Sequence, residues 1–191
     1  MIKLIFLDID GCLSDGGIFI GSDGEVFKRF DVKDGFALQQ WNVKLGGISA
    51  IITGKTSQIV ETRAKELGVK YCFQGVSNKL EKAREILALE NLSFDECAAI
   101  GDDLNDICLL KKVKMSFAPK DASKEAKKYA KFKLSKKGGH GAVREMIELL
   151  LEKNGRKKLG LRAFVCKIGV FCAAKCRLNF LNFIKFTSET K

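Results

Sequence analysis

The chain has 191 residues, of which 46% are hydrophobic and 30% are charged, a composition that suits one folded domain and excludes a disordered chain. The net charge of +11 is concentrated in residues 156–191, which hold nine Lys or Arg and one acid, whereas residues 1–155 hold 25 basic and 22 acidic residues. Because the body is nearly balanced, its charge predicts no nucleic-acid partner.

The cysteine and histidine content excludes two further classes. Seven cysteines, an odd number without a CxxC motif, disfavour a disulfide framework, and a single histidine disfavours a zinc site. No signal peptide is recognisable before the first strand, and no uncharged apolar run approaches the roughly 18 residues of a membrane span. We therefore expect a reduced, cytoplasmic protein without a transmembrane segment.

Hydrophobic periodicity and turn residues predict alternating strands and helices. In chain order these are a buried strand at 2–8, a hairpin at 17–30 around Ser22-Asp23-Gly24, a helix capped by Asp34 and ending near Gly46-Gly47, a strand at 48–53, a helix at 56–68, a strand at 69–73, a helix at 78–90, strands at 97–101 and 115–118, a helix at 122–129, a short strand at 131–134 and a helix at 141–153. This order predicts a doubly wound α/β fold, a parallel sheet with helices on both faces, with a hairpin flap after the first strand.

Polar residues follow the strands of this predicted sheet. They are Asp8 and Asp10, then Thr53, Gly54 and Lys55, then Ser77, Asn78 and Lys79, and finally Gly101, Asp102, Asp103 and Asp106. Parallel strands share one carboxyl edge, so we expect these groups to converge near the switch in strand order. Carboxylates suit Mg²⁺, and a hydroxyl, a lysine and N–H groups at a helix start suit phosphate. Together they predict metal-assisted phosphoryl transfer to a carboxylate.

Each motif also has a simpler explanation. The Asp8–Asp10 pair, the GDDLND turn and Thr53 also suit helix caps, and Lys79 alone suits a solvated surface; only their order at successive strand ends is specific. The sequence TGKT at 53–56 is not a P-loop, because Ser49 stands where that motif requires glycine. His140 has no second histidine beside it and is expected to border a turn.

The ordered motifs LDIDG, ITG, Lys79 and GDDLND resemble those of the haloacid dehalogenase superfamily of phosphatases. Softer signs, DIDGCLSDGG, KRFDVKDG, GVSNKLEK and GGHGAVRE, resemble the subfamily that hydrolyses 3-deoxy-D-manno-octulosonate 8-phosphate, a step of lipopolysaccharide precursor synthesis. The resemblance covers residues 1 to about 155. It implies a phosphatase domain over 1–155 and a separate basic segment over 156–191.

The resemblance also implies roles for the residues at the first and fourth motifs. Asp8 is implied as the nucleophile that becomes an aspartyl-phosphate, and Asp10 as the acid and base that moves protons. The metal ligands it implies are Asp8, the main-chain carbonyl of Asp10, Asp102 and Asp106, with Asp103 in support and Mg²⁺ as the ion.

The second and third motifs are implied to hold phosphate. Thr53 and the N–H of Gly54 would contact phosphoryl oxygens, and Lys79 would offset negative charge on Asp8 and on the phosphoryl group. Lys55 stands where an arginine is expected after ITG, which weakens a bidentate contact to a substrate carboxylate. Lys55 and Arg63 are the candidates for the acidic sugar, although both also suit solvated helix positions.

Members of the subfamily are homotetramers without a large cap domain, and the resemblance implies that their hairpins assemble a barrel. About two dozen residues separate the first motif from Asp34, enough for a hairpin but not for a cap domain.

The segment 156–191 breaks the resemblance, with five phenylalanines, three cysteines and no clean amphipathic stripe. Three interpretations compete: docking on a neighbouring subunit, contact with an acidic membrane surface, or an accidental sequence without ordered structure.

Two classes of function stay open at this point. The first is a Mg²⁺-dependent phosphatase for an eight-carbon acidic sugar phosphate or for a related nine-carbon acylneuraminate 9-phosphate or other sugar phosphate. The second is a non-catalytic binding module that acts through its basic tail. The complete motif set favours the enzyme, and the need for Asp8 separates the two.

Overall fold

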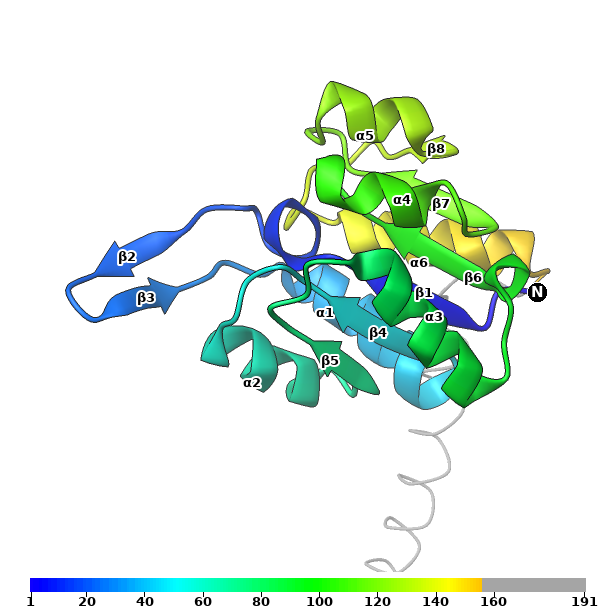
Figure 1. Ribbon diagram of the computed structural model, residues 1–191, viewed down its shortest axis with the longest axis horizontal. Helices are drawn as coiled ribbons and strands as arrows, with labels where there is room; N and C mark the ends of the chain where they lie inside the picture. Colours follow the sequence, from blue (N-terminus) through cyan, green and yellow to red (C-terminus); the bar gives the residue numbers. More distant parts are fainter. Residues whose placement is uncertain (156–191) are drawn as a thin grey trace, which may run out of the picture. The chain divides into compact units, whose positions relative to one another are not determined.

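The computed structural model describes residues 1–155, which form a compact unit (Figure 1). Its main sheet has six parallel strands in the order β5-β4-β1-β6-β7-β8, namely β5 (Tyr71–Phe73), β4 (Ile48–Ile52), β1 (Leu4–Leu7), β6 (Cys97–Ile100), β7 (Met115–Ala118) and β8 (Phe132–Lys133). The chain extends the sheet to one side of β1 and then returns to the other side. The switch in strand order therefore falls at β1, as the doubly wound prediction requires.

Helices cover both faces of this sheet (Figure 1). They are α1 (Val32–Gln39), α2 (Gln58–Glu66), α3 (Lys79–Glu90), α4 (Ile107–Leu110), α5 (Lys124–Tyr129) and α6 (Ala142–Lys153). A π-helical turn at Gln40–Lys44 extends α1, and 3₁₀ turns at Phe94–Glu96 and Leu104–Asp106 precede β6 and α4. The α/β architecture predicted from the sequence is confirmed. Among the described residues, no helix is long and apolar enough to cross a membrane.

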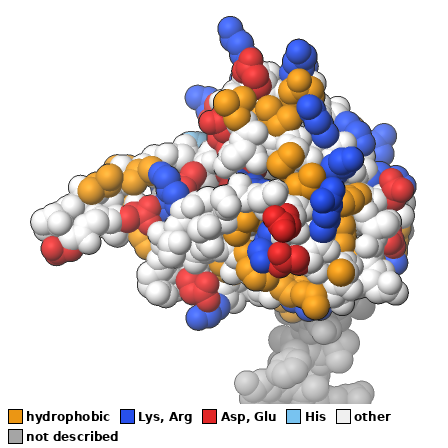
Figure 2. Space-filling model, in the orientation of Figure 1, with side chains coloured by type: hydrophobic (Ala, Val, Ile, Leu, Met, Phe, Trp, Pro, Cys, Tyr) orange, Lys and Arg blue, Asp and Glu red, His pale blue; other side chains and the backbone are white. Residues whose placement is uncertain are grey.

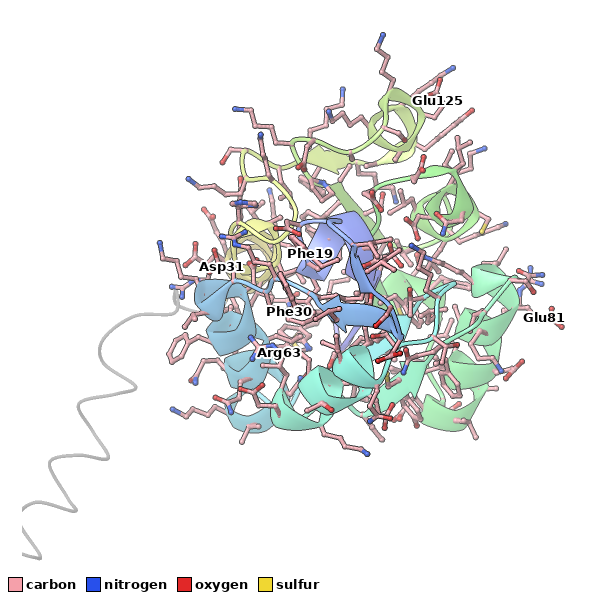
Figure 3. All side chains as sticks on the ribbon, turned by 90° about the vertical axis from the view of Figure 1, so that its left-hand side faces the viewer. Phe19, Phe30, Asp31, Arg63, Glu81 and Glu125 are labelled. Atoms are coloured by element: carbon pink, nitrogen blue, oxygen red, sulfur yellow. The ribbon has the colours of Figure 1, made fainter. Side chains whose placement is uncertain are left out.

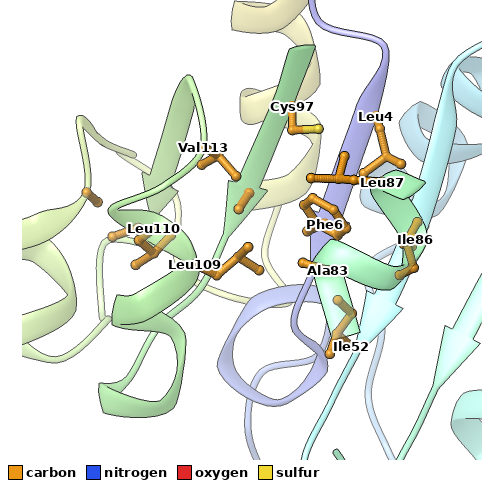
Figure 4. Packing of buried hydrophobic residues seen from close by; sticks show 14 of the residues in the cluster. Leu4, Phe6, Ile52, Ala83, Ile86, Leu87, Cys97, Leu109, Leu110 and Val113 are labelled. Carbon is orange, nitrogen blue, oxygen red and sulfur yellow. The ribbon is translucent and has the colours of Figure 1, made fainter. Parts of the chain in front are cut away.

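A buried apolar cluster fixes the strand that carries Asp8 (Figure 4). Leu4 and Phe6 of β1 pack against Ile86 and Leu87 of α3, with Leu109 of α4 nearby. All four residues of β1 are buried, because a central parallel strand is covered on both faces. Burial of this strand gives the residues that follow it a rigid support.

The predicted hairpin consists of β2 (Phe19–Gly21) and β3 (Gly24–Phe27), which form a separate two-stranded sheet within residues 1–155 (Figure 1). Every residue of both strands is exposed in the single chain. The rings of Phe19 and Phe27 stack with their centroids 4.0 Å apart, and Figure 2 shows hydrophobic side chains along the projecting hairpin. An isolated two-stranded hairpin is at best marginally stable in water, and this one touches the body of the domain through Glu25, which accepts a hydrogen bond from Ser57.

The predicted role of Asp34 as the cap of its own helix was wrong. Asp31 is the N-cap of α1, and its side chain accepts a hydrogen bond from the N–H of Lys33. Asp34 lies inside α1, fully buried, and its carboxylate accepts hydrogen bonds from the N–H groups of Gly141 (3.0 Å) and Arg144 (2.7 Å). It therefore caps α6, a helix more than a hundred residues away in the sequence.

Candidate active site

The residues that follow β1, β4 and β6 line one cavity of about 560 Å³ at the carboxyl edge of the sheet. Its walls include residues from the first, second and fourth predicted motifs: Asp8, Asp10, Gly11, Thr53, Gly54, Lys55, Asp102 and Asp103. The structure thus brings together groups that lie up to 95 residues apart in the sequence. Lys79 lies beneath this wall and reaches the site through Asp8.

Lys79 is buried between two carboxylates. It is the first residue of α3, which Asn78 caps, and its Nζ lies 2.7 Å from Asp8 Oδ1 and 2.6 Å from Asp106 Oδ1. Burial by itself lowers the pKa of a lysine, but the charges of Asp8 and Asp106 outweigh it and raise the pKa of Lys79. The ammonium therefore stays charged and offsets part of the negative charge at Asp8.

Asp106 organises the acidic turn. Besides Lys79, its carboxylate accepts hydrogen bonds from the N–H groups of Asp102 (3.0 Å) and Asp103 (3.3 Å) through Oδ2. Asp103 and Asp106 also form a reciprocal capping box around the 3₁₀ turn. Both oxygens of Asp106 thus have partners in the protein, and this arrangement orients Asp102 toward the cavity.

Asp8 and Asp102 are placed to hold a cation. Carboxylate oxygens of both lie within 4.8 Å of each other and of Cys12 Sγ. The pKa of Asp8 is raised from 3.8 to about 6 by burial and by the charge of Asp106, against the opposing effect of Lys79. Burial and the charge of Asp8 raise the pKa of Asp102 from 3.8 to about 7. A hard divalent cation between these two carboxylates would offset the repulsion that raises their pKa values. The donor set therefore fits Mg²⁺.

Cys12 is a poor competitor for such an ion. Burial, followed by the charges of Asp8 and Asp102, raises the pKa of its thiol well above the ordinary value. A metal-ligating cysteine must be a thiolate, so the oxygen donors dominate the site.

Two glycines permit the close packing of this site. Gly11 has a φ of +83°, and a Cβ there would lie 2.2 Å from Asp102 Oδ2. A Cβ on Gly138 would lie 1.9 Å from the carbonyl oxygen of Gly11. The GGHG segment therefore packs directly on the turn after Asp10, which accounts for these glycines physically.

Asp10 has a lysine partner that the sequence did not reveal. Its Oδ1 accepts hydrogen bonds from Lys28 Nζ (2.7 Å) and, more weakly, from Ser14 Oγ (3.3 Å). Lys28 directly follows β3, so only the fold of the hairpin places it here. Asp15, Asn105 and Asp121 also line the cavity. Asp15 and Asn105 lie inside the DIDGCLSDGG and GDDLND motifs but were given no role there, and Asp121 lies outside every motif.

The two candidates for sugar binding are separated in the single chain. Lys55 lines the cavity. Arg63 instead borders a second groove, where its guanidinium pairs with Glu66 (2.7 Å) and lies 5.4 Å from the ring of Phe30. Figure 3 shows Arg63 beside Phe30. Arg63 thus does not face the cavity of its own subunit, and its proposed contact with substrate stays a prediction.

Comparison with known sequences decides the family. A family model described as haloacid dehalogenase-like hydrolase matches residues 69–147. The 3-deoxy-D-manno-octulosonate 8-phosphate phosphatase of Salmonella typhi is 39% identical over 158 residues, which cover 81% of this chain and 82% of that protein. The enzyme of the same name from Escherichia coli strain K12 is 38% identical over the same length. The chain belongs to the haloacid dehalogenase-like hydrolases.

Solved structures agree with the assignment of the chain to this family. The phosphatase of the same name from Moraxella catarrhalis, in complex with a magnesium ion, a phosphate ion and KDO, superposes with a TM-score of 0.79 at 36% identity and covers 87% of this chain and 93% of its own. A cobalt-bound phosphatase from Haemophilus influenzae gives a TM-score of 0.77 at 32% identity, covering 81% and 90%. The family resemblance, the fold and the identification as a phosphatase are confirmed.

Proposed function

We propose that this hydrolase converts 3-deoxy-D-manno-octulosonate 8-phosphate to the free sugar acid and phosphate, within lipopolysaccharide precursor synthesis. The observation that carries the proposal is the cavity in which Asp8, Asp10, Thr53 and Asp102 meet, with Lys79 bound to Asp8 from below. Relatives at 38–39% identity bear the name of this activity, which supports the choice of substrate.

The first half of the reaction uses Asp8 as the nucleophile. Its carboxylate attacks phosphorus, the bond to the sugar oxygen breaks, and Asp10 gives that oxygen a proton. Thr53 and the N–H of Gly54 contact the phosphoryl oxygens. Lys79 lowers the repulsion between the carboxylate and the phosphate dianion, because its ammonium lies 2.7 Å from the attacking group.

The second half returns the enzyme to its starting state. Asp10, now a carboxylate, takes a proton from water, and the oxygen of that water attacks phosphorus of the aspartyl-phosphate. Phosphate leaves and Asp8 is free again. The same side chain thus acts first as acid and then as base, as the two steps require.

We propose Mg²⁺ as the cofactor, held by Asp8, the carbonyl of Asp10 and Asp102. Asp106 was implied as a further ligand, but both its oxygens have protein partners, so we propose that it supports the turn that carries Asp102, as Asp103 does. The ion supplies charge stabilisation at the phosphoryl oxygens when bound.

We further propose that the phosphatase domain spans residues 1–155, that the enzyme is a cytoplasmic homotetramer assembled through its hairpins, and that it binds no nucleic acid. Lys55 and an Arg63 supplied across a subunit interface are the proposed contacts for the sugar acid. The interpretations of residues 156–191 lie outside the described residues.

The test is phosphate release from a panel of sugar phosphates with Mg²⁺ and with a chelator. We expect the eight-carbon acid to give the highest kcat/KM, activity to be lost on chelation, and Asp8→Asn to lower kcat by about a thousandfold or more. Asp95→Asn, an exposed acid in the Phe94–Glu96 turn, is the matched control and should retain activity. Retained activity in Asp8→Asn would overturn the mechanism, and preference for an acylneuraminate 9-phosphate would change the substrate.

A further inference from the structure

Lys28 is a buried lysine that no role in the proposed reaction uses. Its side chain is 1% exposed, and its Nζ lies 2.7 Å from Asp10 Oδ1 and 2.7 Å from Glu25 Oε1. Taking an ammonium out of water is costly unless carboxylates surround it. Here two carboxylates do so, one from the hairpin and one from the active site.

Glu25 extends this contact to the loop that follows Thr53 and Gly54. Its other carboxylate oxygen accepts a hydrogen bond from the hydroxyl of Ser57. Ser57 stands at the N-cap of α2, yet its side chain makes no capping hydrogen bond, because the hydroxyl is directed to Glu25 instead. A chain of contacts therefore runs from Asp10 through Lys28 and Glu25 to the start of α2, four residues after Thr53.

The two essential carboxylates thus have separate lysine partners. Lys79 binds Asp8 from the body of the enzyme, and Lys28 binds Asp10 from the hairpin. The separation matches the different tasks proposed for them, attack at phosphorus and transfer of a proton. It also keeps the carboxylate of Asp10 from rotating freely, since a 2.7 Å ion pair with a buried ammonium restricts the side chain.

We propose that Lys28 is the positioning residue for Asp10: it holds the carboxyl group in the orientation for proton transfer, and it couples that orientation to the seating of the hairpin through Glu25 and Ser57. The inference rests on the proposed function. It adds that the hairpin, beyond any part in assembly, is a component of the proton-transfer apparatus.

The chemistry of leaving groups gives a readout specific to this role. A sugar alkoxide leaves poorly and needs the proton of Asp10, whereas p-nitrophenolate leaves readily without one. Departure of the leaving group belongs to the first step, which kcat/KM reports. Loss of Asp10 positioning should therefore affect alkyl phosphates much more than aryl phosphates.

The experiment compares Lys28→Met with wild type on p-nitrophenyl phosphate and on whichever sugar phosphate the wild type hydrolyses fastest. We expect kcat/KM to fall about 10- to 100-fold on the sugar phosphate and less than about threefold on p-nitrophenyl phosphate. Lys28→Arg should recover part of the loss, and Glu25→Gln should produce a smaller loss of the same kind. The exposed Lys33→Met in α1 is the matched control and should change neither substrate.

Equal losses on both esters would overturn the proposal, because damage to the fold, the metal site or the assembly slows both alike. That outcome leaves the phosphatase assignment intact, since wild type still hydrolyses both esters and Asp8→Asn neither. Unchanged kcat/KM on the sugar phosphate in Lys28→Met would also overturn it.

Discussion

At the scale of single residues, Lys79 explains how two buried acids, Asp8 and Asp106, share one small site. Its ammonium lies within 2.7 Å of Asp8 and of Asp106, and all three side chains are buried. Removing one partner of a buried ion pair destabilises the fold by more than the net contribution of the pair, because the remaining charge stays buried without a partner. Lys79 thus supports both the stability and the charge balance of the site.

We expect Lys79→Met to destabilise the protein by about 3–5 kcal/mol at neutral pH and to abolish phosphatase activity. The measurement is chemical denaturation together with phosphate release. Arg84→Met, an exposed residue on the same helix, is the control and should change the unfolding free energy by less than about 0.5 kcal/mol. A stable Lys79→Met variant with normal activity would contradict this account.

At the scale of elements, α1 and α6 are joined by one buried carboxylate. Asp34 of α1 accepts hydrogen bonds from the first turn of α6, yet burial raises its pKa from 3.8 to about 6 despite those bonds. The folded state therefore keeps a proton on Asp34 at pH values where the unfolded chain has lost it. Its contribution to stability increases as the pH falls from about 6 and is complete below 3.8, since the folded state binds the extra proton in that range.

We expect the unfolding free energy of wild type, relative to Asp34→Asn, to rise by about 2 kcal/mol between pH 7.5 and pH 4.5. Asparagine keeps the shape of the side chain and one hydrogen-bond acceptor but cannot titrate. The pH dependence of all other groups therefore cancels when the unfolding free energies of the two proteins are subtracted. Denaturant titrations at the two pH values provide the measurement, and Asp95→Asn serves as the exposed control. If the difference in unfolding free energy between wild type and Asp34→Asn did not vary with pH, or fell on acidification, ionised Asp34 would not destabilise the folded state and the account would be wrong.

At the scale of the whole molecule, the hairpin leaves apolar side chains exposed that the single chain does not cover. Ile20 (76% exposed) and Val26 (59%) are open to solvent, and so are the stacked rings of Phe19 and Phe27. Contiguous apolar surface of this kind marks an interaction site. The proposed homotetramer would cover it with copies of the same hairpin.

We expect wild type to sediment as a tetramer and Phe27→Ser to form smaller species at the same concentration. Each copy loses roughly 1.5–3 kcal/mol of buried phenylalanine, a loss repeated four times in the assembly. Val43→Ser removes a side chain of comparable exposure away from the hairpin and should leave the tetramer intact. A monomeric wild type, or a Phe27→Ser tetramer of unchanged stability, would rule out assembly through the hairpin.

The sequence by itself determined the order of strands and helices and the polar residues that follow the strands. The reason is local: apolar periodicity and turn chemistry act over a few residues, and parallel strands necessarily share one carboxyl edge. Asp8, Thr53 and Asp102 could therefore be assigned to one site before any coordinates were known.

Only the tertiary structure decided that Lys28 pairs with Asp10 and which helix Asp34 caps. Lys28 reaches Asp10 because it lies at the base of the hairpin, where the chain returns to the domain after β3. Asp34 caps α6 because α1 packs against that helix, and Arg63 lies away from the cavity of its own chain. These contacts join residues distant in sequence through single side chains, which leave no periodic signal. Their energy comes from burial and pairing, quantities that exist only once the chain has folded.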